Sequence, residues 1–180
     1  EATVSAIDRC GELRKGLLEL CLEPRWKPYV DALTRLKGVD DVVALSFAAT
    51  VDDFSRFPNG RSVSRYFGLT PGRRDSGERV GRNGRITKAG DTTVRRAVIE
   101  GLASLPSHTG ARKRGRRGRE VSAAVEAEAA KCNDRNRRRY RGLVDAGKKA
   151  NVAKTAVASE LVRQMWAIGL VVAREQAAGR

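Results

Sequence analysis

The chain has 180 residues, enough for one compact domain with a buried core, and its formal net charge is +15. Lysine and arginine outnumber aspartate and glutamate by 36 to 21, which favours a nucleic-acid partner. An anionic membrane surface is the weaker alternative, since no stretch combines a basic face with a large exposed apolar one. The most apolar stretch, residues 152–172, is interrupted by charged side chains and predicts a buried helix rather than a bilayer span. Three scattered cysteines and one histidine predict neither a metal site nor a disulfide framework. We therefore expect a cytoplasmic, nucleoid-associated protein.

The first predicted element is an amphipathic helix over residues 3–22, which Pro24 ends. Its apolar stripe contains Ile7, Cys10, Leu17 and Cys21 at helical spacing and is widened by Leu13, Leu18 and Leu20. Such a stripe can pack on its own domain or pair with a second chain as a coiled coil, and Arg14 within the seam weakens the second alternative. Residues 1–24 are interpreted as this separate helix and residues 25–180 as the main domain.

A second helix is predicted from Tyr29 to Lys37 and a third after Asp40 or Asp41, with a turn at Gly38 between them. A helix–hairpin–helix of this kind can present helix N-terminal amides to a nucleic-acid backbone. The commoner role of such a turn is only to connect two helices. Both alternatives stay open, although the two aspartates place negative charge where a phosphate would dock.

Further helices complete a mainly α fold. A short helix through Val63 ends at Gly68, a helix capped by Asp91 ends near Pro106, and two longer helices cover residues 120–144 and 152–174. The connection 107–119 is a low-complexity basic loop, expected to be mobile without nucleic acid and to contact phosphates. Its candidate binding residues are Arg112, Lys113, Arg114, Arg116 and Arg117.

The segment 68–96 is rich in glycine and arginine, a composition suited to a polyanion. Asn83-Gly84 predicts the two-residue turn of a small β-hairpin, with a glycine loop as the alternative. The candidate nucleic-acid-binding residues of the segment are Arg73, Arg74, Arg79, Arg82, Arg85, Lys88, Arg95 and Arg96. The flanking arginines could stabilise charge on a phosphodiester that Ser76 attacks, although a serine–glycine pair is most often only part of a turn.

The ordered motifs of this segment closely resemble the C-terminal transposase domain of the IS-one-ten group of insertion sequences, the bridge-RNA-guided DNA recombinases. The motifs are Gly68-Leu69-Thr70-Pro71, Asp75-Ser76-Gly77, residues 85–91 and Arg95-Arg96. The resemblance covers most of the chain from about Thr34 onward. One departure is the Pro-Gly-Ile-Gly hairpin of the family, which is Lys37-Gly38-Val39-Asp40 in this chain.

The resemblance implies that Ser76 is the nucleophile for DNA strand cleavage and exchange. It also implies DNA and a guide RNA as partners, assembly as a dimer or tetramer, and an N-terminal RuvC-like domain whose carboxylates hold Mg²⁺. No such domain precedes the transposase motifs, so we expect a C-terminal fragment that binds nucleic acid but does not recombine it alone, with no cofactor of its own. The alternatives are a non-catalytic helix–hairpin–helix module that binds nucleic acid and a structural RNA-binding protein of ribosomal type.

Overall fold

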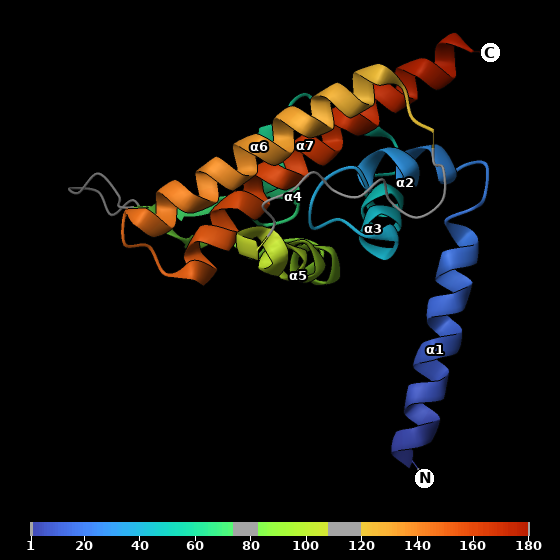
Figure 1. Cartoon of the computed structure of the whole chain (residues 1–180), viewed down its shortest axis with the longest axis horizontal. Helices are drawn as coiled ribbons and strands as arrows, with labels where there is room; N and C mark the ends of the chain where they lie inside the picture. The colour runs from blue at the N-terminus through green and yellow to red at the C-terminus, as the bar shows by residue number, and fades with distance from the viewer. Residues whose placement is uncertain (1, 74–82, 108–119, 180) are drawn as a thin grey trace.

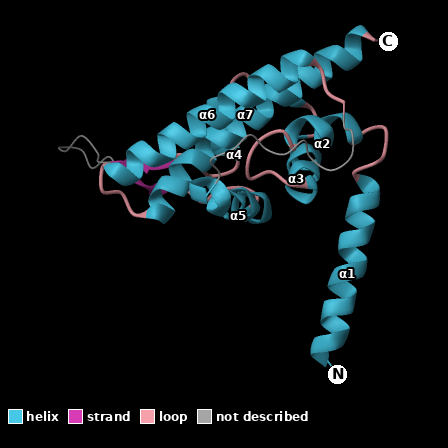
Figure 2. Cartoon of the chain, in the orientation of Figure 1, coloured by secondary structure: helices cyan, strands magenta, loops and turns pink. Residues whose placement is uncertain are grey.

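The structure is a computed structural model that describes residues 2–73, 83–107 and 120–179. The protein is mainly α-helical with one small β-hairpin, as predicted (Figures 1 and 2). The elements are α1 (Ala2–Leu20), α2 (Lys27–Leu33), α3 (Asp41–Val51), the 3-10 helix η1 (Phe54–Arg56), α4 (Gly60–Tyr66), β1 (Pro71–Arg73), β2 (Asn83–Ile86), α5 (Thr92–Gly101), the 3-10 helix η2 (Leu102–Ser107), α6 (Ala123–Asp145) and α7 (Ala150–Ala178).

The longest helix, α7, is the centre of the core and lies beside α6 along its length (Figure 1). Its predicted apolar face is confirmed: Val157, Leu161, Met165 and Ile168 are fully buried. The indole Nε1 of Trp166 donates to the Phe54 carbonyl oxygen at 2.8 Å. By length and composition α7 could also cross a membrane, but half of its apolar window is buried inside the domain, as in the core helix of a globular protein.

Aromatic side chains from the N-terminal half pack beneath α7. The Phe54 ring stacks on Tyr29 with centroids 4.9 Å apart, and the Phe47 ring stacks on Phe67 at 5.3 Å. The backbone of α7 approaches Phe54 so closely that a Cβ at Gly169 would collide with the Phe54 ring. Close packing of this kind gives the small core a fixed geometry.

The predicted helix starts are confirmed by side-chain caps. The Asp40 carboxylate accepts from the Val43 amide at 2.8 Å, and the Asp91 carboxylate accepts from the Val94 amide at 2.7 Å. Each such cap is worth about 1 kcal/mol. The second helix ends at Leu33 and not at Lys37, because the chain tightens into turns that bring Leu36 fully into the core.

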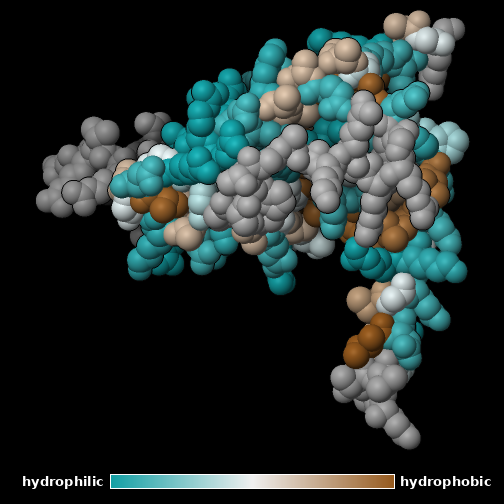
Figure 3. Space-filling view, in the orientation of Figure 1, coloured by the Kyte–Doolittle hydropathy of each residue, from teal (hydrophilic) through white to brown (hydrophobic). Residues whose placement is uncertain are grey.

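Helix α1 extends away from the helical body (Figure 1). The helix itself was predicted, but most of its apolar stripe does not pack on its own domain, since Ile7 and Leu13 are about two-thirds exposed at 66% and 65%. Only the C-terminal end is anchored, through Leu17 and the buried Cys21. Figure 3 shows the apolar side chains on the surface of the projecting helix.

Strands β1 and β2 form an antiparallel hairpin in which Pro71 pairs with Ile86. The prediction of a tight turn at Asn83-Gly84 is wrong, because these two residues open β2. A Cβ at Gly84 would lie 3.0 Å from the Gly72 carbonyl oxygen. The glycine therefore permits close strand pairing, and the connection falls in residues 74–82, outside the described residues.

Candidate nucleic-acid interface

The base of the hairpin is defined by two glycines with positive φ. Gly68 (φ +64°) follows α4 in the predicted C′ position, where the Gly68 and Leu69 amides donate to the carbonyl oxygens of Arg65 and Ser64. Gly90 (φ +74°) precedes α5, and a Cβ there would collide with the Tyr66 carbonyl oxygen. The two ends of the hairpin thus approach each other at distances that only glycine permits.

A buried arginine fastens this base. Arg95 in α5 is only 7% exposed, and its Nη1 donates to the carbonyl oxygens of Phe67 at 3.1 Å and Ala89 at 2.9 Å. Its Nη2 donates to the Thr92 hydroxyl at 3.3 Å. One guanidinium therefore joins the end of α4, the loop after β2 and the first turn of α5.

This placement corrects the prediction that Arg95 is a phosphate ligand. Because its guanidinium is buried and bonded to three protein acceptors, Arg95 holds the hairpin base and does not present charge to solvent. The sequence pattern paired it with Arg96, and a helical step of 100° directs the two side chains to different faces of α5. Arg96 is the exposed member of the pair.

Exposed cations surround the hairpin base. Arg85 of β2, Lys88 of the following loop and Arg96 of α5 are all exposed, and their binding to nucleic acid stays a prediction. The Arg96 guanidinium lies 3.6 Å from the Glu100 carboxylate with both side chains in solvent, an ion pair worth at most about 1 kcal/mol that a phosphate could displace.

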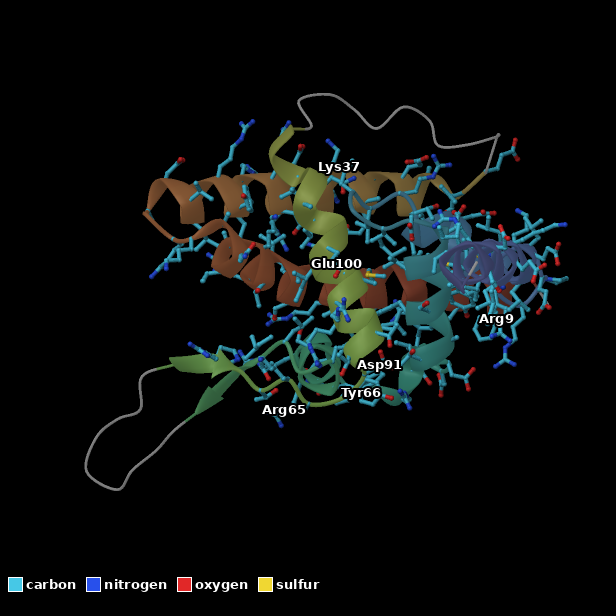
Figure 4. All side chains as sticks on the ribbon, turned by 90° about the horizontal axis from the view of Figure 1, so that it is seen from below. Arg9, Lys37, Arg65, Tyr66, Asp91 and Glu100 are labelled. Carbon is cyan, nitrogen blue, oxygen red and sulfur yellow. The ribbon has the colours of Figure 1, made fainter. Side chains whose placement is uncertain are left out.

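The sequence analysis missed two further arginines, Arg61 and Arg65, which lie one turn apart on α4 and are exposed. Figure 4 shows Arg65 and Tyr66 between the hairpin and the N-terminal end of α5, which Asp91 caps. Their spacing of four residues was the available signal, since it places two cations on one face of a helix.

Several predicted site residues lie outside the described residues. These are Ser76, Arg74, Arg79 and Arg82 in the hairpin connection, and Arg112, Lys113, Arg114, Arg116 and Arg117 in the predicted basic loop. Arg73 is described only as backbone in β1. The structure therefore places the two ends of the segment that carries Ser76, and the roles of these residues remain predictions.

The turn at Gly38 has a different environment. Gly38 (φ +87°) packs against the last turn of α5, where a Cβ on Gly101 would collide with the Gly38 carbonyl oxygen. Val39 is buried, and the Asp40 carboxylate already occupies the first-turn amide of α3. The geometry supports the commoner of the two alternatives, a turn that connects and packs helices.

A second group of cations lies where α6 meets α7, toward the same end of the molecule as the hairpin (Figures 1 and 4). The exposed members are Arg138, Arg139, Arg141, Lys148 and Lys149. Two other arginines of α6 form ion pairs, Arg137 with Asp134 at 3.0 Å and Arg135 with Glu160 at 3.8 Å. The sequence showed this basic run but gave it no role.

Within residues 2–73, 83–107 and 120–179, no three or more histidine, cysteine, aspartate or glutamate side chains gather as a possible metal site. The resolved pKa shifts lie on other elements than the hairpin. Burial raises the pKa of Tyr29, hydrogen bonds from Ser55 lower the pKa of Asp53, and burial raises the pKa of the Cys132 thiol to about 11.

Comparison with known proteins identifies the family. A model of the Transposase IS116/IS110/IS902 family matches residues 30–117, which include the Gly38 turn and the whole hairpin base. The chain is also 44% identical over 149 residues to y4qE of Sinorhizobium fredii, a protein named as a transposase. The match covers 81% of this chain and 38% of that protein, so the chain spans well under half of its relative. The chain therefore contains a domain of the Transposase IS116/IS110/IS902 family, in agreement with the resemblance seen in its sequence.

Proposed function

We propose that this chain is the part of an insertion-sequence transposase that binds DNA and supplies Ser76 as the nucleophile for strand cleavage. The observation that carries the proposal is the construction of the hairpin base. Arg95 and two glycines fix both ends of the segment that contains Ser76, while Arg85, Lys88 and Arg96 remain exposed around them. A fixed base with exposed positive charge at its surface suits a site that must position a phosphodiester.

The exposed arginines and lysines would bind the DNA backbone without reading its sequence. Phosphate contacts give affinity and register, and they carry no base information. Following the family resemblance, we propose that a guide RNA selects the target and binds this protein as a second partner. The Gly38 turn has no direct part in this function because its backbone is packed on α5.

In the proposed reaction the Ser76 hydroxyl oxygen attacks the phosphorus of a DNA phosphodiester and its proton passes to a base. The bond from phosphorus to serine oxygen forms as the bond from phosphorus to the 3′ oxygen breaks, and that oxygen gains a proton. Attack by a freed 3′ hydroxyl of the exchanged strand then releases the serine. Arginines near the phosphate would stabilise the charge of the transition state.

The family resemblance implies Mg²⁺, which would activate the nucleophile and neutralise developing charge when bound. The described residues do not fit that role, because they contain no cluster of carboxylates. We propose that the metal-binding carboxylates belong to a RuvC-like domain outside these 180 residues. The short span of the match, 38% of the relative, is consistent with additional domains.

We further propose that α1 mediates self-association as a helix pair between two copies of the chain. The support is its exposed apolar stripe, with Ile7 at 66% and Leu13 at 65%. Replacing both residues with aspartate should convert a dimer or tetramer into a monomer in sedimentation velocity. An unchanged sedimentation coefficient would exclude α1 as the interface.

The chemistry can be tested by joining this chain to the rest of its reading frame and supplying Mg²⁺, guide RNA and nicked target DNA. Peptide mass spectrometry should find a nucleotide attached to Ser76, and Ser76→Ala should abolish the adduct and cleavage while DNA binding persists. The exposed Ser55 on η1 provides the matched control, since Ser55→Ala should leave the adduct intact. Cleavage that survives Ser76→Ala would favour the non-catalytic binding module instead.

A further inference from the structure

An exposed aromatic cluster lies beside the hairpin base. Tyr66 is 40% exposed, and in the described ranges it is the only aromatic side chain with that much of its surface in solvent. The Phe57 ring meets it edge-on with centroids 5.4 Å apart, and the Arg56 guanidinium lies over both rings, 4.6 Å from Phe57 and 4.9 Å from Tyr66. The Arg56 cation thus lies against the electron-rich faces of two aromatic rings at the surface.

The cluster is held in place from below. The buried Phe67 ring contacts the Tyr66 ring edge-on at 5.2 Å, and the Arg56 guanidinium also donates to the Thr50 carbonyl oxygen at 3.1 Å. Phe57 packs against the core. Because these contacts restrict the rotamers of Tyr66 and Arg56, little conformational entropy would be lost when a ligand stacks on them.

The aromatic cluster lies next to the hairpin base, the surface proposed above to bind DNA. The Tyr66 carbonyl faces Gly90 at the hairpin base, and the exposed Arg65 lies beside it (Figure 4). The exposed Lys88 is tied to the same base, since its amide donates to the Gly68 carbonyl oxygen at 3.1 Å. In the described residues Arg56, Arg61 and Arg65 form no ion pair. Arg56 does attract the Asp53 carboxylate, whose pKa is lowered mainly by hydrogen bonds from Ser55 and further by the Arg56 charge. An aromatic ring bordered by unpaired arginines provides a surface for a base and cations for the phosphates on either side of it.

A similar pair elsewhere lacks this combination. Arg25 lies over the Trp26 ring at 4.5 Å, but its guanidinium is also bonded to the Asp52 carboxylate at 2.5 Å. Trp26 is half-buried and packed against the core. We therefore interpret the Arg25–Trp26 pair as a local structural contact. It provides a control for the exposed Arg56–Tyr66 pair.

We propose that Tyr66 and Arg56 form a stacking platform for an unpaired DNA base adjacent to the strand held at the hairpin. The proposal rests on the DNA-binding function proposed above and deepens it, because it assigns to this surface the recognition of an unstacked strand. Stacking on one ring accounts for roughly a tenfold preference for a single-stranded extension over blunt duplex.

The test compares binding of the 180-residue chain to a blunt DNA duplex and to the same duplex with a short single-stranded extension that contains 2-aminopurine. The parent chain should prefer the extended duplex and quench the fluorescent base. Tyr66→Leu should lose the preference and the quenching while blunt-duplex affinity changes less than twofold. Tyr66→Phe should retain both, and so should Trp26→Leu as the control; thermal melts confirm that each variant is folded.

The outcomes separate the two proposals. A parent chain that binds neither DNA refutes the DNA-binding function and the platform with it. A parent chain that binds both, with a preference for the extension that Tyr66→Leu leaves intact, refutes the platform alone. Loss of quenching in Tyr66→Phe would show that the hydroxyl and not the ring is recognised. Tighter Tyr66-dependent binding of the same extension made of RNA would overturn the assignment to DNA.

Discussion

The Gly38 turn and the hairpin base look alike in sequence, and the structure gives them different roles. Both contain a glycine with positive φ that allows a close approach of two backbone segments. At Gly38 the approaching segment is α5, and the adjacent cavity of about 490 Å³ is lined by charges of both signs, from Arg14, Lys37, Asp40 and Glu100. At the hairpin base the surroundings are Arg85, Lys88 and Arg96, all exposed.

The comparison shows what a glycine turn signals. Glycine marks a close backbone approach, and the approaching group can be a phosphate or another helix. At both turns an aspartate already accepts from a first-turn amide, Asp40 in α3 and Asp91 in α5. The surrounding charge is therefore what distinguishes them, since the hairpin base keeps three cations at its surface.

The largest expected effect concerns the packing of the Gly38 turn. Gly101→Ala should destabilise the protein by about 4 kcal/mol, because the new Cβ would collide with the Gly38 backbone, which cannot move as a side chain can. Gly142→Ala is the matched control, because that glycine of α6 has open space and alanine should add about 0.5 to 1 kcal/mol of helix stability. Urea unfolding monitored by circular dichroism measures both. Equal unfolding free energies for Gly101→Ala and the parent protein would contradict the close contact between Gly101 and the Gly38 turn.

The next effect concerns the hairpin base. Arg95→Met should cost about 3 kcal/mol, since it leaves the buried carbonyl oxygen of Phe67 and the partly buried one of Ala89 without their charged donor. Arg96→Met on the next position of α5 should change the unfolding free energy by less than about 0.5 kcal/mol, because that side chain is exposed. The same urea titration decides the matter. A larger loss of unfolding free energy in Arg96→Met than in Arg95→Met would contradict the role of Arg95 in holding the hairpin base.

For DNA binding, the exposed cations of the hairpin base should matter more than residues of the Gly38 turn. Changing Arg85, Lys88 and Arg96 to glutamine together should weaken duplex DNA binding more than tenfold near physiological salt. The slope of log affinity against log salt should fall by about one per lost phosphate contact. Lys37→Gln beside the Gly38 turn serves as the control and should leave that slope unchanged. Fluorescence anisotropy over a salt series measures both, and equal slopes for the triple variant and the parent would exclude these three cations.

The smallest effect is a pH dependence in the helical body, away from the DNA. Burial is the main cause that raises the pKa of Cys132 from its ordinary 9.0 to about 11, and the Glu128 carboxylate adds to it. A raised pKa means that the folded protein retains a proton that the unfolded chain loses, so stability is complete below pH 9 and falls between pH 9 and 11. The loss at pH 10 should be about 1 kcal/mol. Cys132→Ala should flatten this part of the pH profile, and an unchanged profile would refute the shift.

The sequence was a sufficient guide to the helices because local signals and periodicity act together. The caps at Asp40 and Asp91, the Gly68 terminus and the buried face of α7 were all predicted. The strand register was not, because Asn83-Gly84 carries the strongest local turn signal although its glycine is used for close pairing with β1. Tertiary contacts overrode the local preference.

The candidate site was only partly predictable for a similar reason. Composition identified segment 68–96 as basic, and charge alone could not distinguish the buried Arg95 from the exposed Arg96. The aromatic platform at Tyr66 joins α4 to the residues after η1, a contact that no linear motif contains. Such assignments require knowledge of which side chains the fold leaves exposed.

Chemical footprinting of lysines tests the DNA-binding role of the hairpin base most directly. Acetylation of the chain with and without duplex DNA, read by peptide mass spectrometry, compares Lys88 at the hairpin base with Lys37 beside the Gly38 turn. We expect DNA to reduce the modification of Lys88 several-fold while Lys37 reacts equally in both samples. Protection of Lys37 with an unprotected Lys88 would contradict this role. It would indicate that DNA binds at the helix–hairpin–helix turn around Gly38 instead.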